Sequence, residues 1–360
     1  MCVTGGAGFI GGHLVDALLS LGANISVIDD LSNATAEHLG ELIDIEPDRV
    51  RFVHGSILDD AALDDAFESA ESVFHLAAVS SVPRSIADPE RTYAVNAVGT
   101  MRVAEAARRA GVKRIIYSAS SSAYGASERL PKVETDVPEP VSPYAASKLA
   151  GEGVMQAWSH AYGLSSVCLR YFNIFGPRQP ADSPYSGVIA VFARKLLAGE
   201  SPVIFGDGLQ SRDFTYVANA VLANLLAASA DRAFTGEPIN IGAGEKTDLV
   251  HLARSVAESC GVPQLKPVFQ AARTGDVKHS LADLTRARDL LGYQPIIALS
   301  DGLAQTIEWY RTQYSETNPP AARRSGGGKT GGGHPSAGSE GEGASGSDEA
   351  GGGGAGGGRR

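Results

Sequence analysis

A tyrosine and a lysine form the clearest catalytic pattern in this sequence. Tyr144 and Lys148 are four residues apart, so on a helix their side chains share one face. A tyrosine with its usual pKa of ~10 is a weak base at neutral pH, but a nearby cation favours the phenolate and lowers that pKa. The pair is therefore a candidate general base, although this spacing is also common on amphipathic helices.

A serine cluster, Ser118 to Ser122, follows a β-branched run that predicts a strand over 114–118. The carboxyl ends of strands in an open α/β sheet face the ligand. Ser120 is therefore a candidate for binding a reacting oxygen, and Ser122 lies two residues further on.

A glycine loop near the N-terminus is a candidate phosphate-binding site. In the stretch from Thr4 to Gly11, Gly5 allows a tight turn, Gly8 allows the backbone to approach a pyrophosphate, and Gly11 allows the helix to pack on the strand. Asp29, at the end of the next predicted strand, is placed to accept hydrogen bonds from the adenosine ribose. A carboxylate there repels a 2′-phosphate, and no arginine follows closely, which favours NAD over NADP.

Short β-branched runs alternate with helical periods in the first half, which is typical of βαβ units. We predict an α/β fold with a Rossmann-like, doubly wound parallel sheet. Strands are expected at 1–3, 25–29, 51–54, 72–76, 114–118 and 166–171, and helices at 11–20, 61–70, 96–110, 143–162, 188–198, 217–228 and 299–312. The first strand is short for a strand at the centre of a sheet, so we expect the natural start to lie upstream.

The chain divides into three expected parts. Residues 1–172, with contributions from about 211–240, form a dinucleotide-binding domain, and 173–322 form a smaller α/β substrate-binding lobe. Residues 323–360 are rich in glycine and have almost nothing to bury, which predicts a disordered tail.

Composition excludes several classes of function. A net charge of −10 over 360 residues argues against nucleic-acid binding, which needs a basic face. The N-terminus has no signal-type pattern and no long apolar run occurs, so no membrane association is expected. Three cysteines provide no disulfide framework and suit a reducing compartment, which indicates a cytoplasmic protein.

Taken together, these motifs resemble those of the extended short-chain dehydrogenases/reductases, and specifically the nucleotide-sugar 4-epimerases. The resemblance covers nearly all of residues 1–315. It rests on the glycine loop, the serine cluster, Ser142 to Lys148, and further matching stretches at 27–33, 75–78, 170–179, 185–189, 206–214 and 275–283.

The resemblance implies a mechanism and a cofactor, NAD. Tyr144 would take the proton of the sugar 4-hydroxyl while hydride passes to NAD, Lys148 would hold the nicotinamide ribose, and Ser120 would bind the 4-oxygen. The 4-keto intermediate would turn over and take the hydride back, so NAD need not leave. The NAD-binding positions implied are Gly5, Gly8, Phe9, Ile10, Gly11, Asp29, Asn33, Ile57, Leu76, Ala77, Ala78, Asn96, Tyr144, Lys148 and Tyr171.

The resemblance also implies where a UDP-sugar would bind. Asn173 would contact the diphosphate, Arg212 and Arg273 would neutralise it, and Phe205 would contact uracil. The complete implied set is Ser120, Ser122, Tyr144, Asn173, Val188, Phe205, Arg212, Arg273, Asp276 and Ser280. One departure is Gly55-Ser56-Ile57, where the family usually has an aspartate near the adenine.

Single residues at positions that differ between members of the family indicate which substrate and which reaction to expect. Ser280 stands where the family has a tyrosine in enzymes restricted to UDP-glucose and UDP-galactose, so a serine favours UDP-N-acetylglucosamine and UDP-N-acetylgalactosamine, with the non-acetylated pair also open. Dehydratases carry an Asp-Glu pair at Ser121 and Ser122, and decarboxylases carry a glutamate at Ser122, which disfavours both.

A UDP-uronic acid 4-epimerase and a non-catalytic NAD or nucleotide-sugar binder stay open as alternatives. The resemblance further implies a homodimer in which the 96–110 and 144–162 helices form a four-helix bundle. Apolar residues on more than one face of these helices agree with that packing, and burial against the sheet explains many of them equally well. These residues are Val98, Met101, Ala104, Ala107, Met155 and Trp158.

Overall fold

A parallel sheet of seven strands lies at the centre of the protein. The computed structural model describes residues 1–181, 187–272 and 278–317. The spatial order is β11, β6, β5, β4, β1, β2, β3, and every neighbouring pair is parallel. The strands are β1 Cys2–Thr4, β2 Ile25–Asp29, β3 Val50–His54, β4 Ser72–His75, β5 Arg114–Ser120, β6 Ser165–Tyr171 and β11 Thr235–Ile241. The predicted doubly wound fold is confirmed, and its order reverses between β1 and β4, where such sheets bind ligands.

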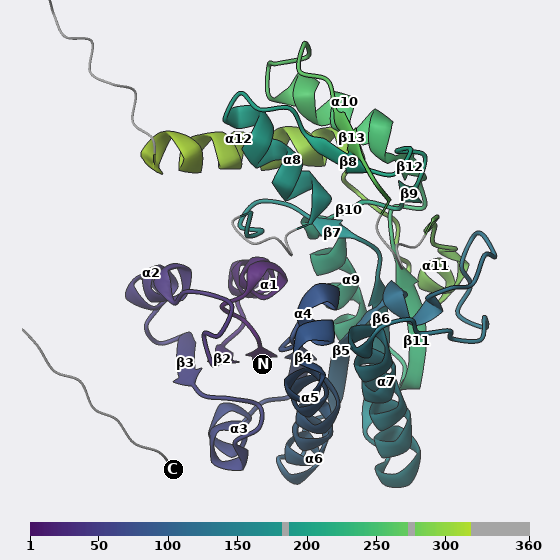
Figure 1. Cartoon of the computed structure of the whole chain (residues 1–360). Helices are drawn as coiled ribbons and strands as arrows, with labels where there is room; N and C mark the ends of the chain where they lie inside the picture. Colours follow the sequence, from purple (N-terminus) through teal and green to yellow (C-terminus); the bar gives the residue numbers. More distant parts are fainter. Residues whose placement is uncertain (182–186, 273–277, 318–360) are drawn as a thin grey trace, which may run out of the picture. The chain divides into compact units, whose positions relative to one another are not determined.

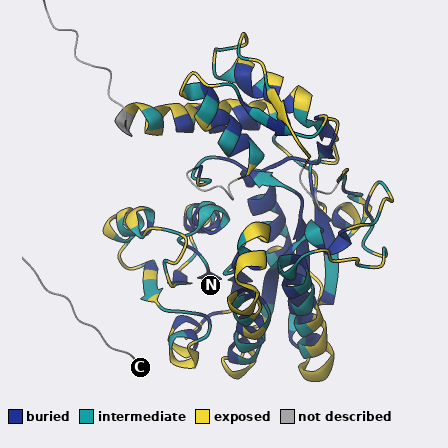
Figure 2. Ribbon diagram, viewed as in Figure 1, coloured by how far each residue is buried: buried dark blue, intermediate teal, exposed yellow. Residues whose placement is uncertain are grey.

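Helices cover both faces of this sheet. On one face Leu14 of α1 (Phe9–Ser20) packs in the same core as Ala223 of α9 (Val217–Ser229). On the other face, Val103 and Met155 lie in a second core. Figure 2 shows the central strands of the sheet largely in dark blue, while the outward surfaces of the helices are teal and yellow. The helices of this second face are α3 Asp60–Ala66, α6 Thr100–Arg109 and α7 Pro143–Tyr162.

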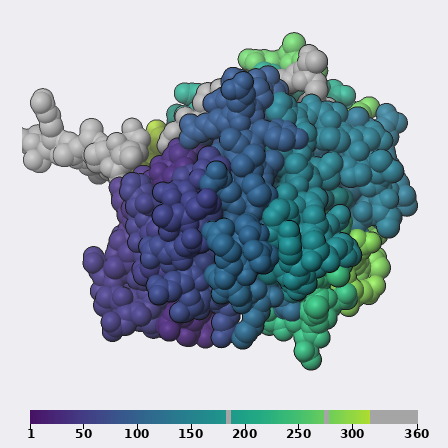
Figure 3. Space-filling model, turned by 90° about the horizontal axis from the view of Figure 1, so that it is seen from below, coloured from purple at the N-terminus to yellow at the C-terminus, as the bar shows by residue number. Residues whose placement is uncertain are grey.

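Shorter elements complete this half of the protein. They are α2 Glu37–Ile45, α4 Val82–Ala87, α5 Pro89–Tyr93, the π-helical turn η1 Ala94–Gly99 and the 3-10 turn η2 Ser121–Tyr124. Seen from below in Figure 3, the purple, blue and teal segments lie next to one another across the surface.

The later part of the chain builds a lobe with its own core, drawn at the top of Figure 1. Its apolar residues include Phe192, Leu252 and Ile307. Strands pair here only in twos: β7 with β10 and β8 with β13 in parallel, and β9 with β12 antiparallel. The bounds are β7 Ile174–Phe175, α8 Val188–Leu197, β8 Val203–Phe205, β9 Ser211–Arg212, β10 Thr215–Tyr216, β12 Thr247–Asp248, α10 Leu249–Ser259, β13 Val268–Gln270 and α12 Leu299–Thr317. The helix α11 Thr285–Leu291 packs instead in the core beside the sheet, against β11 and α9.

Six of the seven sheet strands agree with the sequence prediction to within two residues at either end. The seventh, β11, was missed because it contains Gly236 and Pro238, which usually interrupt strands. At the edge of the sheet the interruption is tolerated: Gly236 has φ 84°, and the register with β6 shifts between Thr235 and Pro238.

The short first strand pairs along its full length on both sides, with β2 and with β4. No helix among the described residues is long and apolar enough to cross a bilayer. The division at residue 172 stays a prediction, and the predicted tail at 323–360 lies outside the described residues.

Candidate active site

A cleft of about 1230 Å³ runs along the carboxyl ends of the central strands. Its wall is built by the residues that follow β1, β2, β4, β5 and β6, and the lobe contributes Gly187, Arg212, His279 and Ser280. This is the position at which an open α/β sheet binds its ligands, and the volume is large enough for two ligands of nucleotide size.

The glycine loop forms one end of the cleft. Gly5 has φ 71°, and a Cβ there would lie 2.7 Å from the backbone nitrogen of Ala77. A Cβ on Gly11 would lie 2.1 Å from the Gly5 carbonyl oxygen, so Gly11 lets α1 pack against the loop, whereas the sequence interpretation has it packing against the strand. Gly8 caps α1 without a side chain, which leaves the first N–H groups of the helix facing the cleft for an anion.

Asp29 ends β2 and faces the same end of the cleft. Its Oδ2 accepts a hydrogen bond from the N–H of Ala7 (3.0 Å), and its Oδ1 accepts one from Leu31 (2.9 Å). Burial raises the pKa of this carboxyl, and the two backbone hydrogen bonds oppose the rise. Each carboxylate oxygen keeps a lone pair, so Asp29 is able to accept hydrogen bonds from ribose hydroxyls.

Tyr144 and Lys148 lie in the first two turns of α7, whose start is fixed by Pro143 and by Ser142, which accepts a hydrogen bond from Ala145 (3.1 Å). Lys148 is buried, and its Nζ lies 4.4 Å from the centroid of the Tyr117 ring. Both side chains line the cleft. The predicted placement of this pair on one helix face therefore agrees with the structure.

Burial dominates the electrostatics of this pair. It lowers the pKa of Lys148 to about 7, and it raises the pKa of Tyr144, against a hydrogen bond with Ser120 that lowers it. The sequence interpretation expected Lys148 to lower the pKa of Tyr144. In the structure the burial of the phenol outweighs the hydrogen bond with Ser120, so the pKa of Tyr144 lies above its usual value.

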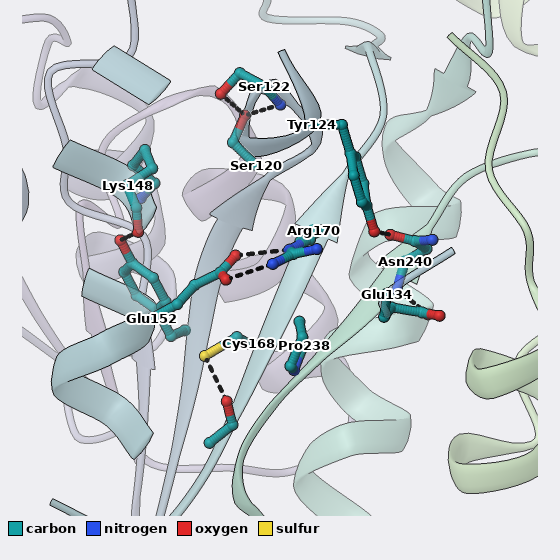
Figure 4. A network of polar contacts seen from close by, with 12 residues as sticks. Ser120, Ser122, Tyr124, Glu134, Lys148, Glu152, Cys168, Arg170, Pro238 and Asn240 are labelled. Carbon is teal, nitrogen blue, oxygen red and sulfur yellow. Dashed lines mark hydrogen bonds and ion pairs between the residues drawn. The ribbon is translucent and has the colours of Figure 1, made fainter. Parts of the chain in front are cut away.

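The serine cluster orients a proton toward Tyr144. Ser120 Oγ accepts hydrogen bonds from Ser122 Oγ (2.8 Å) and from the N–H of Ser122 (3.2 Å), as Figure 4 shows. With both acceptor positions occupied, the proton of Ser120 is left to donate to the oxygen of Tyr144 or of a bound substrate. The predicted role of Ser122 close to Ser120 therefore has a geometric basis.

A buried ion pair beneath Lys148 was not predicted from the sequence. Glu152 accepts two hydrogen bonds from Arg170, from Nε (2.9 Å) and Nη2 (2.8 Å), and each side chain is at most 4% exposed. Arg170 also lies 4.8 Å from the centroid of the Tyr124 ring (Figure 4). Glu152 continues the four-residue spacing of Tyr144 and Lys148, and this repeat is the signal that could have revealed it.

Asn96 does not occur among the described residues that line the cleft. Its side chain accepts from the N–H of Val79 (2.8 Å) and donates to the Val79 carbonyl (3.1 Å) and to Ser147 Oγ (3.0 Å). Asn96 therefore links the loop after β4 to the catalytic helix, and its predicted contact with NAD stays a prediction. The other fourteen predicted NAD-binding residues all line the cleft.

The predicted substrate residues divide into three groups. Ser120, Ser122, Tyr144, Asn173, Arg212 and Ser280 line the cleft. Val188, at the start of α8, packs against the lobe core, and Phe205 ends β8; neither is among the described lining residues. Arg273 and Asp276 lie outside the described residues.

Among the described residues, four further basic side chains line the cleft without having been predicted: Arg84, Arg91, Lys132 and His279. Arg84 donates a hydrogen bond to Asn33 across the mouth of the cleft. Sequence reasoning missed Arg84 because it is far from Asp29 in the chain.

A doubly wound sheet whose glycine loop, strand-end aspartate and tyrosine–lysine–serine set share one cleft is the arrangement of an extended short-chain dehydrogenase/reductase. Within that class the chain belongs to the NAD dependent epimerase/dehydratase family, which matches residues 1–242. The family confirms NAD as the cofactor, and the resemblance seen in the sequence is confirmed with it.

Similar proteins point to nucleotide sugars. A UDP-glucose 4-epimerase of Mycolicibacterium smegmatis is 41% identical over 313 residues, 86% of this chain and 98% of that protein. A dTDP-glucose 4,6-dehydratase of Streptomyces niveus is 33% identical over 86% of this chain and 92% of that protein. A UDP-N-acetylglucosamine 4-epimerase from Methanobrevibacter ruminantium, solved with UDP-N-acetylmuramic acid, has a TM-score of 0.81 and 37% identity, covering 87% of this chain and 98% of that chain.

Proposed function

We propose that this protein is an NAD-dependent 4-epimerase of UDP-sugars. The observation that carries the proposal is that Tyr144, Lys148 and Ser120 lie in the same cleft as the glycine loop and Asp29. A general base, a hydroxyl donor and a dinucleotide site are the groups needed to oxidise a secondary alcohol and reduce it again.

In the proposed reaction Tyr144 takes the proton of the sugar 4-hydroxyl. NAD, when bound, would supply the acceptor for the hydride from C4 of the sugar and the donor for its return. Ser120 donates to the 4-oxygen in both directions. Lys148 holds the ribose and supplies positive charge beside the phenol. Tyr144 gives its proton back when the hydride returns to the opposite face of the 4-keto sugar, so the protein needs no external oxidant or reductant.

For the substrate, we propose UDP-N-acetylglucosamine and UDP-N-acetylgalactosamine, with UDP-glucose and UDP-galactose accepted less well. Ser280 lines the cleft, and its backbone is held in place by the hydrogen bond from its N–H to the Ser211 carbonyl (3.0 Å). A serine at this fixed position leaves room for an acetamide. Arg212 and Asn173 line the same region and are proposed to bind the diphosphate, together with Arg273; Asp276, Val188 and Phe205 are proposed to contact the rest of the UDP group.

Dehydration is a less suitable function for this cleft. Ser121 and Ser122 line it where a dehydratase needs an acid and a base to eliminate water. Two hydroxyls do not exchange protons readily at neutral pH. A UDP-uronic acid 4-epimerase needs the same catalytic set, so substrate trials separate it from the proposed reaction.

The test is NMR of the purified protein with UDP-N-acetylglucosamine, UDP-glucose and UDP-glucuronate in separate tubes, without added NAD. Appearance of the 4-epimer is expected, fastest with the acetylated sugar. Tyr144→Phe removes the base and is expected to lower the rate at least ~100-fold. Tyr162→Phe changes an exposed tyrosine at the other end of α7 and serves as the control. Turnover by Tyr144→Phe at the wild-type rate would refute the mechanism, and conversion of UDP-glucuronate alone would reassign the substrate.

We further propose a cytoplasmic homodimer. Cys2, Cys168 and Cys260 are unpaired, which agrees with a reducing compartment. The dimer proposal rests on the family resemblance, and Val98 in η1 and Tyr162 at the end of α7 are exposed apolar side chains that a partner chain could cover.

A further inference from the structure

Asp213 is a buried carboxylate that the proposed reaction does not use. It follows Arg212 directly, between β9 and β10, and its side chain is 0% exposed. Asp213 is not among the described residues that line the cleft, so it does not contact a substrate directly. Burying a carboxylate is costly unless its oxygens are well satisfied by donors, so its partners show what it is for.

Backbone N–H groups from two separate segments satisfy this carboxylate. Oδ1 accepts from Ala243 (2.7 Å), and Oδ2 accepts from Gly244 (3.0 Å) and from Ala282 (3.1 Å). Residues 243–244 follow β11, whereas Ala282 comes about forty residues later in the sequence. A single side chain thus connects the end of the sheet to the 278–282 segment of the lobe.

The carboxylate of Asp213 is tightly packed against Gly242 and Ala282. A Cβ on Gly242 would lie 2.7 Å from Asp213 Oδ2 and 2.8 Å from Ala282 Cβ. The glycine at 242 therefore permits the carboxylate and the 278–282 segment to approach this closely. A methyl group added at Gly242 must therefore displace either the carboxylate of Asp213 or the 278–282 segment.

The segments joined by Asp213 carry the proposed substrate contacts. Ser280 lies two residues before Ala282, and its N–H donates to Ser211 (3.0 Å). The N–H of Ser211 in turn donates to the Lys278 carbonyl (3.0 Å), so the 278–282 segment is paired with β9. The side-chain amide of Asn173 donates to the backbone carbonyl of Asp213 (3.1 Å). Arg212, Ser280 and Asn173 all line the cleft, and all are anchored within two residues of Asp213 or its partners.

We propose that Asp213 is a positioning residue for the nucleotide sugar: its carboxylate fixes the relative positions of Arg212, Asn173 and Ser280 and thereby sets substrate affinity. This inference rests on the proposed function for the identity of the substrate. A carboxylate accepts hydrogen bonds at both oxygens, whereas an amide accepts at one only. Loss of one acceptor releases Ala243 on one side, or Gly244 and Ala282 on the other, and loosens the link between the two segments.

The test compares Asp213→Asn with wild type in three measurements: KM for the UDP-sugar, kcat, and NAD content after desalting. A rise in KM of ~10-fold or more is expected, with kcat within ~3-fold and NAD content unchanged, because the glycine loop and α7 are not bonded to Asp213. Asp283→Asn is the matched control. It lies on the same stretch of chain, but its carboxylate accepts a hydrogen bond from the N–H of Thr285 at the start of α11 (2.9 Å). Its KM is expected to stay at the wild-type value.

A second variant separates the proposed effect on substrate affinity from a general loss of folding. Gly242→Ala leaves the charge in place and pushes the carboxylate away from the 278–282 segment, so it too should raise KM without lowering NAD content. An unchanged KM in both variants would overturn the inference, as would loss of kcat and NAD together at constant KM, which is the signature of general destabilisation.

UDP alone, titrated by calorimetry, measures the proposed diphosphate contacts of Arg212 and Asn173 without turnover. If the wild-type protein failed to epimerise any UDP-sugar, the proposed function would fall, while a weaker Kd for UDP in Asp213→Asn would still support the positioning role. Equal Kd values for UDP in wild type and variant would refute it.

Discussion

Glu152 is the counter-charge of two buried cations, Lys148 and Arg170. Its carboxylate raises the pKa of Lys148, which burial has lowered to about 7. Replacement by glutamine removes that effect, so Lys148 loses its proton at a lower pH. We expect Glu152→Gln to move the high-pH limb of the kcat profile to lower pH by about one unit or more, measured by epimerisation at saturating substrate.

A control is needed because an unpaired Arg170 at this depth costs about 3–5 kcal/mol of stability. The double variant E152Q/R170M removes both charges and should regain part of that stability while keeping the shifted profile. A pH profile identical to wild type in the folded double variant would show that Glu152 has no influence on Lys148.

Ser280 allows a second prediction for a single residue. A tyrosine at this position would occupy the part of the cleft that we assign to the acetamide. Ser280→Tyr is therefore expected to lower kcat/KM for UDP-N-acetylglucosamine at least ~10-fold relative to UDP-glucose, a difference of about 1.4 kcal/mol. Competition between the two sugars in one tube, followed by NMR, measures the ratio directly. An unchanged ratio would mean that other side chains select the sugar.

At the scale of whole elements, the sequence was sufficient to predict the bounds of a helix or strand where several local signals agree with each other. The start of α7 carries a serine cap, a proline at the first turn and the catalytic spacing, and both its bounds were predicted correctly. The helix predicted over 96–110 begins instead as η1 and continues as α6, and the missed strand β11 contains glycine and proline. For β11 the long-range pairing with β6 decides the backbone conformation, which local sequence patterns do not reveal.

The same limit applies to the site. The motif residues of the cofactor end could be placed because each follows a strand. The direction in which Asn96 points depends on Val79 and Ser147, from two other segments, and no spacing encodes that arrangement. Asp213 and Arg170 are likewise defined by partners that are distant in sequence.

A chain of buried hydrogen bonds connects β1, β4 and α6 and leads to the third prediction. Thr100 donates to the Asn96 carbonyl (2.7 Å), so it accepts from Nε2 of His75 (2.9 Å). Nδ1 of His75 then accepts from Thr4 Oγ1 (2.7 Å), which accepts from the N–H of Ala77 (3.2 Å). His75→Leu breaks this chain beside Ala77 in the cleft. We expect it to lose ~1–3 kcal/mol of stability and to retain less NAD after desalting.

The contribution of His75 can be measured from the pH dependence of the free energy of unfolding. Burial lowers the pKa of His75 to about 3, against a value near 6.5 in the unfolded chain. Between these values the unfolded state binds a proton that the folded state does not, so wild-type stability falls as the pH drops from about 6.5 toward 3. Urea denaturation across this range should show a smaller fall for His75→Leu, whereas His54→Leu, an exposed change on β3, should follow wild type. Equal slopes for all three proteins would contradict the assignment.

At the scale of the whole molecule, burial narrows the proposed dimer surface. Ala104, Ala107 and Met155 are buried in the core beside the sheet, so these residues are unavailable to a partner. Trp158 donates to Glu105 (3.2 Å) and so joins α6 to α7 within one chain. The exposed apolar residues that remain nearby are Tyr93, Val98 and Tyr162, at 45, 43 and 57%. We expect a dimer to bury these three.

The last prediction is that Val98→Asp weakens this dimer without inactivating the protein. A carboxylate buried in an apolar interface loses its hydration, so sedimentation equilibrium at roughly 10 µM should show a dimer for wild type and a monomer for the variant. Ile45→Asp adds the same charge at a residue that is 72% exposed at the end of α2, and it should stay dimeric. Val98 is not among the described residues that line the cleft, so epimerisation per chain should persist in the monomer. A wild-type monomer would remove the dimer proposal, and lost activity in a folded Val98→Asp monomer would mean that the partner chain supports the cleft.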